Sequence, residues 1–324
     1  MKIKVGFVGC GGIARWHVSH LEKMDDVAIV AACDVIPERA EALAKPFGAR
    51  TYTCHNDMYE NEDLDAVFIC IPPDQHTDTE TAAVARGFHI FVQKPMALCM
   101  EKAHEVADAI EKAGVVSAVG FQDRYLDISD SLIEFLKDKK VGLFTGAWVG
   151  GVPGVPWWPI KAQSGGQVVE QTIHLYDMAR MYFGEVETVY CASGKGIVQG
   201  VENYDVEDYS SVTMTFANGI VGTITTGDYL TEAAPRNGLE IYTPEVRIEY
   251  ELRSAVRYYS RTRSWEERRV RDQGYDCDRA FIDAVKAKDP TAVRSPYKDA
   301  LRSLAVTLAA NKSMETGQAV KVEY

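Results

Sequence analysis

Residues 6–14 read Gly6-Phe7-Val8-Gly9-Cys10-Gly11-Gly12-Ile13-Ala14. Gly9 directly follows a strand-like apolar run, and a helical pattern starts at Ile13. The spacing Gly9-x-Gly11-x-x-Ala14 is typical of a dinucleotide-binding turn. Gly9 would permit the tight turn, Gly11 would let the backbone approach a pyrophosphate, and Ala14 would let the helix pack closely on the strand. The amides at the helix start would favour that anion. The alternative is an ordinary tight turn between a strand and a helix.

The second strand-like run ends in a carboxylate, Asp34, 20 residues after Ala14. At this offset an acidic side chain is expected to bind the hydroxyls of an adenosine ribose and to repel a 2′-phosphate. We therefore expect NAD(H) as the cofactor in preference to NADP(H). Arg39 leaves NADP(H) open, because a guanidinium could accommodate the phosphate. The alternative role for Asp34 is to cap a helix that begins at Pro37.

Strand and helix patterns alternate through the first part of the chain. Strands are expected at residues 3–8, 28–33, 66–71, 90–92 and 115–119, and helices at 13–24, 37–47, 74–86 and 100–113. Continuous apolar strands alternating with amphipathic helices predict a parallel sheet that is covered on both faces. We expect a doubly wound Rossmann domain over residues 1–122.

The pattern changes after about residue 123. Helices are expected at 128–137 and 168–182, strands at 188–192, 209–216, 220–226, 239–242 and 246–250, and further helices at 278–288 and 296–316. Ala217-Asn218-Gly219 predicts a hairpin between two of these strands. Residues 123–324 are therefore expected to form an α+β domain with a large, mostly antiparallel sheet, whose C-terminal helices could pack back on the first domain.

Composition narrows the class of protein. The 324 residues are 46% hydrophobic and 25% charged, which is typical of a globular protein and excludes a disordered chain, a collagen or a coiled coil. No apolar run approaches the roughly 20 residues of a transmembrane helix. The net charge of −12 argues against nucleic acid as a partner. The arginine-rich stretch 261–271 also holds Glu266 and Glu267, and is interpreted as a strand pair.

Cysteine usage indicates a reducing compartment. The seven cysteines lie at positions 10, 33, 54, 70, 99, 191 and 277, without a Cys-x-x-Cys pair or a nearby histidine cluster. Neither a zinc site nor a disulfide framework is therefore expected. The N-terminal sequence begins a strand at once and carries no signal-peptide pattern. We expect a cytoplasmic protein.

Two further strand ends carry polar motifs, where ligands bind in sheets of this kind. The first is Cys70-Ile71-Pro72-Pro73-Asp74-Gln75-His76, in which His76 could simply be a solvent-exposed residue at a helix start. The second is Gln93-Lys94-Pro95, whose X-Pro bond could be cis and would then fix where the lysine points. The positive charge of a nicotinamide would favour the neutral form of Lys94 and suit it to proton transfer. A surface lysine is the alternative.

A later segment places three titratable side chains at helical spacing. Glu170, His174 and Asp177 stand at i, i+4 and i+7, so one helix would carry all three on one face. Gly165-Gly166 just ahead could let a ligand approach the helix start. The alternatives are a metal site, which no other histidine or cysteine cluster completes, and a histidine that only satisfies the core.

Together these blocks resemble the Gfo/Idh/MocA family, named after glucose–fructose oxidoreductase and inositol dehydrogenase, from one end of the chain to the other. Gln93-Lys94-Pro95 is similar to the family's Glu-Lys-Pro motif, and the segment Phe121–Tyr125, with Arg124, to its crossover between domains. The resemblance implies a Rossmann domain, a sheet domain and a substrate lying between them. Gln93 in place of the usual Glu, and Glu170 where sugar and polyol dehydrogenases often carry Asp, are departures from the pattern.

The resemblance also implies hydride transfer between a secondary alcohol carbon and the nicotinamide. His174 would be the general base, Lys94 would hold the hydroxyl and share the proton relay, and Asp177 and Glu170 would orient His174 or bind neighbouring hydroxyls. Trp157 and Trp158 could stack on a sugar ring or only plug the domain interface. We predict substrate contacts from Glu170, Arg124, Trp157 and Trp158, and cofactor contacts from Gly9, Gly11, Gly12, Ile13, Asp34, Pro72, His76, Gln93 and Lys94.

Three functions remain open at this point. The first is an NAD-dependent dehydrogenase of a sugar, a sugar derivative or a cyclitol. The second is a glycosidase or lyase that oxidises, eliminates and reduces again without consuming NAD. The third is a dinucleotide-binding regulator without catalysis, against which the retention of Lys94, His174 and Asp177 argues. The expected partner is a small carbohydrate or polyol, and the resemblance implies a homodimer or homotetramer formed through the C-terminal sheet.

Overall fold

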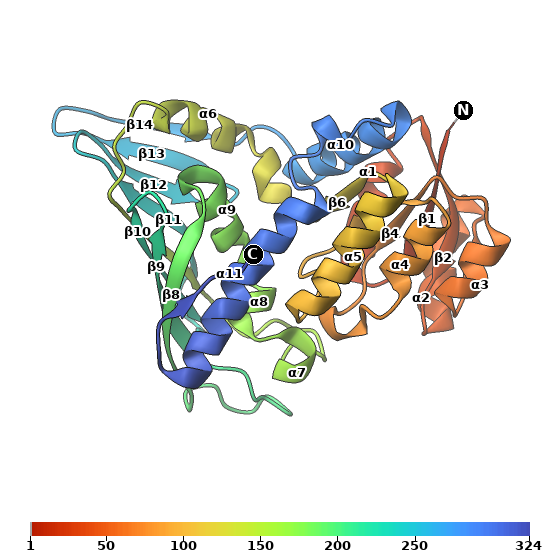
Figure 1. The fold of residues 1–324 in the computed structure, drawn as a ribbon, viewed down its shortest axis with the longest axis horizontal. Helices are drawn as coiled ribbons and strands as arrows, with labels where there is room; N and C mark the ends of the chain where they lie inside the picture. Colours follow the sequence, from red (N-terminus) through yellow and green to blue (C-terminus); the bar gives the residue numbers. More distant parts are fainter. Residues whose placement is uncertain (1) are drawn as a thin grey trace. The chain divides into compact units, whose positions relative to one another are not determined.

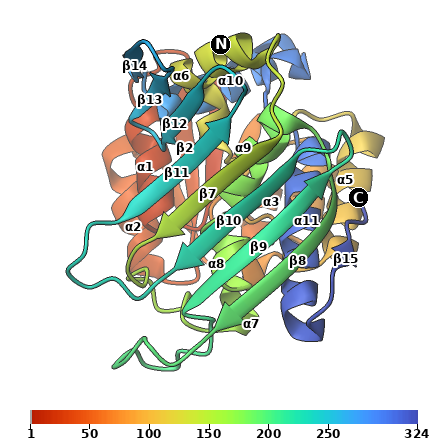
Figure 2. The same ribbon diagram turned by 90° about the vertical axis from the view of Figure 1, so that its left-hand side faces the viewer.

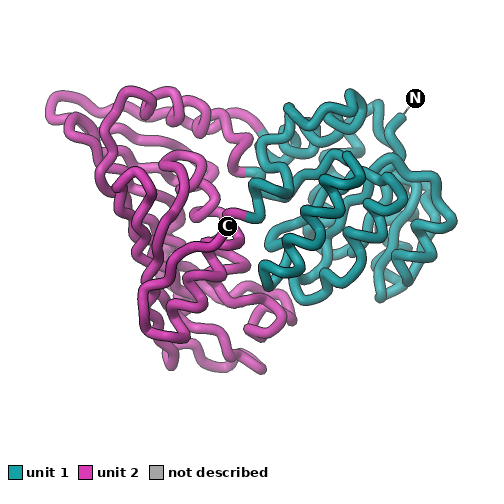
Figure 3. Tube along the Cα trace, in the orientation of Figure 1, with its two compact units in different colours: residues 1–122, 272–301 teal, residues 123–271, 302–324 magenta. Residues whose placement is uncertain are grey.

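The computed structural model describes residues 2–324, which form two compact units (Figure 3). The first unit runs to Gln122 and also includes Asp272–Leu301. The second unit comprises Asp123–Arg271 and Arg302–Tyr324. No helix among residues 2–324 is long and apolar enough to cross a membrane.

The first unit is built on a parallel sheet of six strands in the order β3-β2-β1-β4-β5-β6 (Figure 1). The strands are β1 Ile3–Val8, β2 Val27–Cys33, β3 Arg50–Tyr52, β4 Ala66–Ile69, β5 His89–Val92 and β6 Ser117–Val119. This order reverses direction beside β1 and confirms the predicted doubly wound sheet. Only the short, largely exposed β3 was not predicted, because it offers no continuous apolar run.

Helices cover the six-stranded sheet. They are α1 Gly12–Leu21, α2 Pro37–Ala44, α3 His55–Asn61, α4 Thr79–Ala85, α5 Met100–Ala113 and α10 Gln273–Ala287. The core includes stacked rings from neighbouring strands, with centroids 5.2 Å apart for Phe7 and Phe68 and 4.8 Å apart for Phe68 and Phe91. Phe281 of α10 meets Phe68 and Phe91 edge-on at 5.5 Å. A late segment of the chain therefore completes the core of the first unit.

The second unit contains a nine-stranded sheet in the order β14-β13-β12-β11-β7-β10-β9-β8-β15 (Figure 2). The strands are β7 Leu143–Val149, β8 Val186–Gly194, β9 Tyr209–Phe216, β10 Val221–Gly227, β11 Arg236–Tyr242, β12 Arg247–Glu251, β13 Ala255–Tyr259, β14 Ser264–Arg268 and β15 Val320–Lys321. Neighbouring strands are antiparallel except for β7 and β10, which are parallel. The mostly antiparallel sheet is thus confirmed. So is the hairpin at Ala217–Gly219, where Gly219 has a φ of +86°.

The helices of the second unit lie on one face of this sheet (Figure 1). They are α6 Asp127–Leu136, α7 Lys161–Ser164, α8 Gln167–Glu170, α9 Ile173–Phe183 and the part of α11 Tyr297–Thr316 that follows Leu301. The opposite face is turned toward the viewer in Figure 2. The arginine-rich stretch lies at the sheet edge, where β14 pairs with β13, as the interpretation as a strand pair predicted.

Candidate active site

The glycine-rich turn of the first unit admits only glycine at position 9. Gly9 has a φ of +82°, and a Cβ atom on it would lie against the carbonyl oxygen of Cys70, well inside contact distance. Its amide also donates to the carbonyl oxygen of Cys33 at 2.8 Å. The turn is therefore held between the ends of β2 and β4, and a side chain would force these strand ends apart.

The start of α1 has the properties of an anion-binding site. Gly11 is the N-cap, no side chain caps the helix, and its first turn contains no acidic residue. A Cβ atom on Gly11 or Gly12 would meet no heavy atom within 4 Å, and Ile13 is 40% exposed. The backbone amides and the positive end of the helix dipole are thus accessible, which fits the pyrophosphate of a dinucleotide.

Asp34 holds the same turn from the end of β2. It is 7% exposed, and its two oxygens accept hydrogen bonds from the amides of Cys10 at 2.8 Å and Ile36 at 2.9 Å. The N-cap of α2 is Ile36, not Asp34, so the capping role weighed for Asp34 is wrong. Each carboxylate oxygen retains a second lone pair that could accept a ribose hydroxyl.

The three thiols around the turn are not nucleophiles. Burial raises the pKa of Cys10 and of Cys33 to about 12 and raises the pKa of Cys70 well above its usual value. A thiolate would be needed for nucleophilic attack or for metal binding. Burial therefore disfavours thiolate formation by these three cysteines.

His76 differs from the exposed helix-start residue that the sequence favoured. It is 7% exposed and lies after a short 3₁₀ turn, Pro73–Gln75, which delays α4 until Thr79. Its Nδ1 atom forms a hydrogen bond with the fully buried Glu80. Pro72 and Pro73 shape this segment, because proline fixes φ and cannot donate a backbone hydrogen bond.

Gln93 and Lys94 follow β5 at the same end of the sheet. The Lys94–Pro95 bond is cis. Gln93 is 6% exposed, and its amide lies between His17 Nε2, 2.5 Å from Gln93 Nε2, and the Lys94 amide, 3.2 Å from Gln93 Oε1. Lys94 is therefore preceded by a side chain that is fixed on both sides.

In the second unit, Glu170, His174 and Asp177 do not share one helix. Glu170 ends α8, whereas His174 and Asp177 belong to α9, so the single helix predicted at 168–182 is wrong. At the interruption the backbone N–H of Thr172 donates to the carbonyl oxygen of Gln167, five residues earlier, at 2.9 Å, and its hydroxyl lies within reach of the same oxygen at 3.2 Å. Gly165 and Gly166, with φ of +81° and +85°, make the bend that precedes α8.

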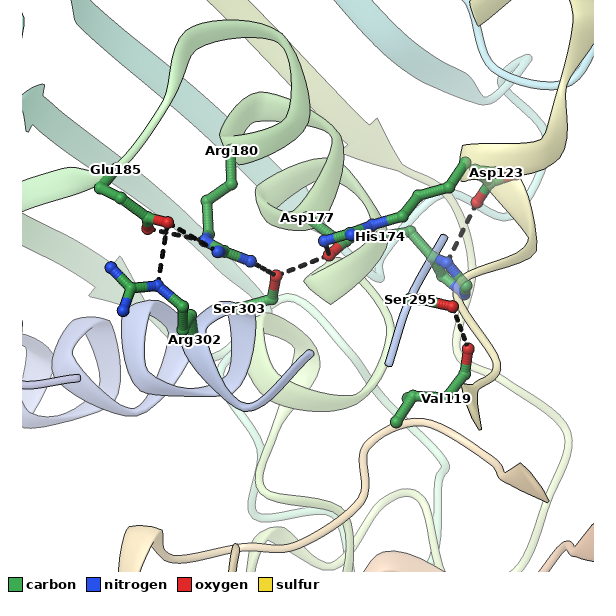
Figure 4. A network of polar contacts seen from close by, with 10 residues as sticks. Val119, Asp123, His174, Asp177, Arg180, Glu185, Ser295, Arg302 and Ser303 are labelled. Carbon is green, nitrogen blue, oxygen red and sulfur yellow. Dashed lines mark hydrogen bonds and ion pairs between the residues drawn. The ribbon is translucent and has the colours of Figure 1, made fainter. Parts of the chain in front are cut away.

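His174 is oriented by a carboxylate that the sequence analysis did not single out. His174 is 5% exposed, and its Nδ1 atom lies 3.0 Å from Oδ2 of Asp123 (Figure 4). Asp123 is 1% exposed and accepts two hydrogen bonds from Arg253, at 2.6 and 2.8 Å. Burial alone would raise the pKa of Asp123, but Arg253 and His174 more than offset it and hold that pKa well below its usual value.

Asp177 belongs to a separate network. It accepts two hydrogen bonds from Arg124, at 2.7 and 2.6 Å, and one from Ser303 at 2.6 Å. Ser303 in turn accepts from Arg180, which pairs with Glu185 (Figure 4). The expectation that Asp177 orients His174 is replaced by this finding, because Asp123 is the carboxylate beside the imidazole.

The two tryptophans serve different purposes. Trp158 is fully buried, and its indole N–H donates to Oε2 of Glu170 at 2.8 Å. Trp157 is only partly buried. The ring of Trp148 on β7 lies nearly parallel to the imidazole of His174, with centroids 6.1 Å apart and an interplanar angle of 17°. Trp158 therefore plugs the unit and fixes Glu170, whereas Trp157 and Trp148 are partly exposed and could stack on a ligand.

Comparison with known proteins agrees with this architecture. Residues 3–121 match the model of an oxidoreductase family with an NAD-binding Rossmann fold, and residues 140–249 match the C-terminal domain of the same family. The chain belongs to the Gfo/Idh/MocA family. As a member of this family, the protein is an NAD(P)-dependent oxidoreductase.

Two curated relatives and one solved structure illustrate the family. The chain is 26% identical over 336 residues to myo-inositol 2-dehydrogenase of Thermotoga maritima, covering 99% of each chain. It is 29% identical over 239 residues to D-glucoside 3-dehydrogenase of Escherichia coli, covering 67% of this chain and 68% of the other. The fold also matches a levoglucosan dehydrogenase solved with NADH and levoglucosan, with a TM-score of 0.88 at 20% identity and full coverage of both chains.

Proposed function

We propose that the protein is an NAD(H)-dependent dehydrogenase that acts on a secondary alcohol of a sugar, a sugar derivative or a cyclitol. The observation that carries this proposal is the buried pair of Asp123 and His174, with Arg253 anchoring the carboxylate. A carboxylate beside one imidazole nitrogen fixes the tautomer and makes the other nitrogen the proton acceptor. The names of the dehydrogenases that resemble the chain support the substrate class.

In this proposal each polar group has a distinct task. The cofactor supplies or accepts the hydride when it is bound. His174 takes the hydroxyl proton through Nε2, because Asp123 holds the proton on Nδ1. Lys94 binds the same hydroxyl and shares in the proton transfer. Gly9, Gly11, Gly12, Ile13, Asp34, Pro72, His76 and Gln93 form the proposed cofactor site.

The remaining candidate residues are proposed to bind the substrate. Arg124 is held rigidly by Asp177 and offers a cation to substrate hydroxyls. Glu170 is fixed by Trp158 and would accept a hydroxyl proton in a hydrogen bond. Trp157 offers an aromatic face to the sugar ring. Asp177 thus acts through Arg124 in this proposal.

The test is an assay of the purified protein with NAD⁺ and a panel of sugars, cyclitols and aryl glycosides. Reduced nicotinamide is followed by absorbance, and products are analysed in the same wells. Net NADH formation that is lost in Lys94→Ala would support the dehydrogenase. Glycoside cleavage without net NADH would replace it with the redox-cycling glycosidase. Dinucleotide binding without turnover of any substrate would favour a regulator.

We further propose that the protein assembles through the outer face of the nine-stranded sheet. A row of neighbouring side chains there runs from Thr145 through Thr223 and Thr213 to Tyr190, without a charged residue. Tyr190 is 46% exposed, and Leu143 and Val221 in the adjacent row are 44% and 36% exposed. On β11 to β14 the same row continues with the charged residues Glu240, Glu249, Arg257 and Glu266, so the uncharged part of this face is confined to β7, β10, β9 and β8. An uncharged patch of this kind suits the centre of a homodimer or homotetramer interface. The cytoplasmic location stays a prediction from the sequence.

A further inference from the structure

A buried chain of hydrogen bonds leads to the peptide of Lys94 within the first unit. Asp278 of α10 is fully buried, and its oxygens lie 2.7 Å from Nδ1 of His17 and 2.7 Å from Nδ1 of His20. His17, on α1, is 1% exposed, and its Nε2 atom lies 2.5 Å from Nε2 of Gln93. Gln93 Oε1 accepts from the Lys94 amide at 3.2 Å. Three separate segments therefore meet at the end of β5.

The direction of each hydrogen bond from Lys94 through Gln93 and His17 to Asp278 can be deduced. The backbone N–H of Lys94 can only donate, so the oxygen of the Gln93 amide must face it. The NH₂ group of Gln93 then faces His17, whose Nε2 atom must accept. The imidazole proton consequently lies on Nδ1, where it is donated to the carboxylate of Asp278. Each donor in this series therefore faces an acceptor.

The space around Gln93 leaves its amide little freedom. Gly120 follows β6, and a Cβ atom at that position would lie 2.6 Å from Oε1 and 2.8 Å from Nε2 of Gln93. The absence of a side chain at Gly120 therefore lets the amide occupy its place between His17 and Lys94. Gly120, directly after β6, therefore helps to determine where the Gln93 amide lies.

We propose that Asp278, acting through His17 and Gln93, is a positioning residue for Lys94, and that Gln93 is required because Nε2 of His17 accepts a hydrogen bond from its side-chain amide. The proposal rests on the proposed role of Lys94 in the reaction. A glutamate at position 93 would set a carboxylate oxygen against the lone pair of His17 Nε2. His17 would then have to bind a second proton between two carboxylates. Gln93, which replaces the glutamate of the family's usual motif, therefore supplies the donor that His17 needs when Asp278 accepts the proton of Nδ1.

His17, His20 and Asp278 are also residue types that bind metals, and their ligand atoms lie within 4.8 Å of one another. A metal ion on Nδ1 of His17 would displace the proton on which the proposal depends. Metal analysis of the purified protein therefore belongs to the test. A stoichiometric metal that is lost in Asp278→Asn would overturn the proposal.

The first experiment reads the histidine protons directly, by nuclear magnetic resonance of the full chain labelled with ¹⁵N-histidine. The signal of His17 is assigned by its loss in His17→Gln. We expect a neutral ring with the proton on Nδ1 in the wild type and a doubly protonated ring in Gln93→Glu. In the double variant Gln93→Glu with Asp278→Asn, the donor and acceptor roles of these hydrogen bonds reverse: the new asparagine at position 278 donates to Nδ1 of His17, and Nε2 donates to the new glutamate at position 93. The ring should therefore be neutral with its proton on Nε2. A proton on Nε2 in the wild type, or an unchanged His17 in Gln93→Glu, would overturn the proposal.

The second experiment measures kcat and KM with a substrate found by the panel. Gln93→Glu and Gly120→Ala should each lower kcat by roughly tenfold to a hundredfold, since small misplacements of a reacting group have effects of this size. Gly120→Ala displaces the amide without changing a charge, so it tests the geometry even if Gln93→Glu does not fold. Gln199→Glu, an exposed position in the second unit, is the matched control and should leave both constants unchanged.

The two proposals fail in different ways. Unchanged kcat in both variants, with the expected change at His17, would show that the chain does not position Lys94 and would overturn this inference alone. Absence of any turnover in the wild type would contradict the proposed function, and the resonance experiment would still decide whether Asp278, His17 and Gln93 are coupled as described.

Discussion

Gly9 and Gly87 adopt nearly the same backbone conformation for different reasons. Their φ angles are +82° and +80°, but a Cβ atom on Gly87 would meet no heavy atom within 4 Å, whereas one on Gly9 would strike the carbonyl of Cys70. Comparing Gly9 with Gly87 therefore separates two reasons for a glycine: a positive φ, and the lack of space for a Cβ atom. Of the two, Gly9 combines both contributions, at the turn where the cofactor is proposed to bind.

We predict that Gly87→Ala lowers the free energy of unfolding by about 1–2 kcal/mol, the usual difference for an alanine in the left-handed region. Gly9→Ala should lower it by clearly more and should also weaken NAD⁺ binding, because the strand ends that hold the turn must move. Denaturant unfolding and isothermal titration with NAD⁺ measure the two effects. Equal losses of stability in both variants would contradict the steric argument.

At His174, we predict that substitution by Ala lowers kcat by roughly 10²–10⁴-fold, the contribution expected of a general base. Dinucleotide binding should persist, because His174 lies in the second unit and the glycine-rich turn lies in the first. His104→Ala is the matched control, since His104 is exposed on α5. Full activity of His174→Ala would exclude the proposed role.

The sequence named His174 but not its carboxylate partner. Asp123 lies in a short 3₁₀ helix, Gln122–Tyr125, which is too short for a periodic pattern to indicate which way a side chain points, and Arg253 follows 130 residues later. Arg253 also has a φ of +60°, a conformation that sequence reasoning would not assign to an arginine. Short-range spacing identifies residues such as Lys94 that follow a strand, whereas pairs formed across the fold need the structure.

Helix α9 is fixed to β8 and α11 by Glu185. Its oxygens accept from Arg180 at 2.9 Å and from Arg302 at 2.9 Å (Figure 4). Burial alone would raise the pKa of Glu185, but Arg180 and Arg302 outweigh it and lower the pKa to about 2. The ionised carboxylate therefore stabilises the fold at every pH above the usual glutamate pKa of about 4.3.

We predict that Glu185→Gln lowers the free energy of unfolding by about 1 kcal/mol at pH 7, a value reduced for the partial exposure of the pair. Because the folded-state pKa is depressed, this difference should shrink as the pH falls from about 4 toward 2. Denaturant unfolding of both proteins across this range measures it. Glu187→Gln, an exposed neighbour on β8, is the control. A difference that does not vary with pH would refute the mechanism.

Element types were predictable where the hydrophobic pattern was long and regular. The interruption after Glu170 was not predictable, because the Thr172 N–H bonds five residues back to Gln167 instead of four, and no hydrophobic pattern marks that change. Strand β7 was also missed. It carries Gly146 at a point where a Cβ atom would lie 2.9 Å from Leu239 Cδ2, so close packing rather than β propensity selects that residue.

For the whole molecule, we predict that the uncharged part of the nine-stranded sheet, on β7, β10, β9 and β8, forms the contact between copies. Thr223→Arg places a cation in the middle of that face and should shift the assembled species toward the monomer. Size-exclusion chromatography with light scattering measures the mass. Thr291→Arg, an exposed position in the first unit, should leave the mass unchanged. A monomeric wild-type protein would contradict the proposed assembly.

The first unit is discontinuous, because residues 123–271 lie between its two segments. During translation the rings of Phe68 and Phe91 emerge long before Phe281, which covers them. At a synthesis rate of roughly 5–20 residues per second, the interval between Phe91 and Phe281 lasts about 10 to 40 s. Throughout it the nascent chain presents an unfinished aromatic surface beside the ribosome, and Asp278 has not yet reached His17 and His20. The order in which residues leave the ribosome thus delays completion of the nucleotide-binding half until most of the polypeptide has been made.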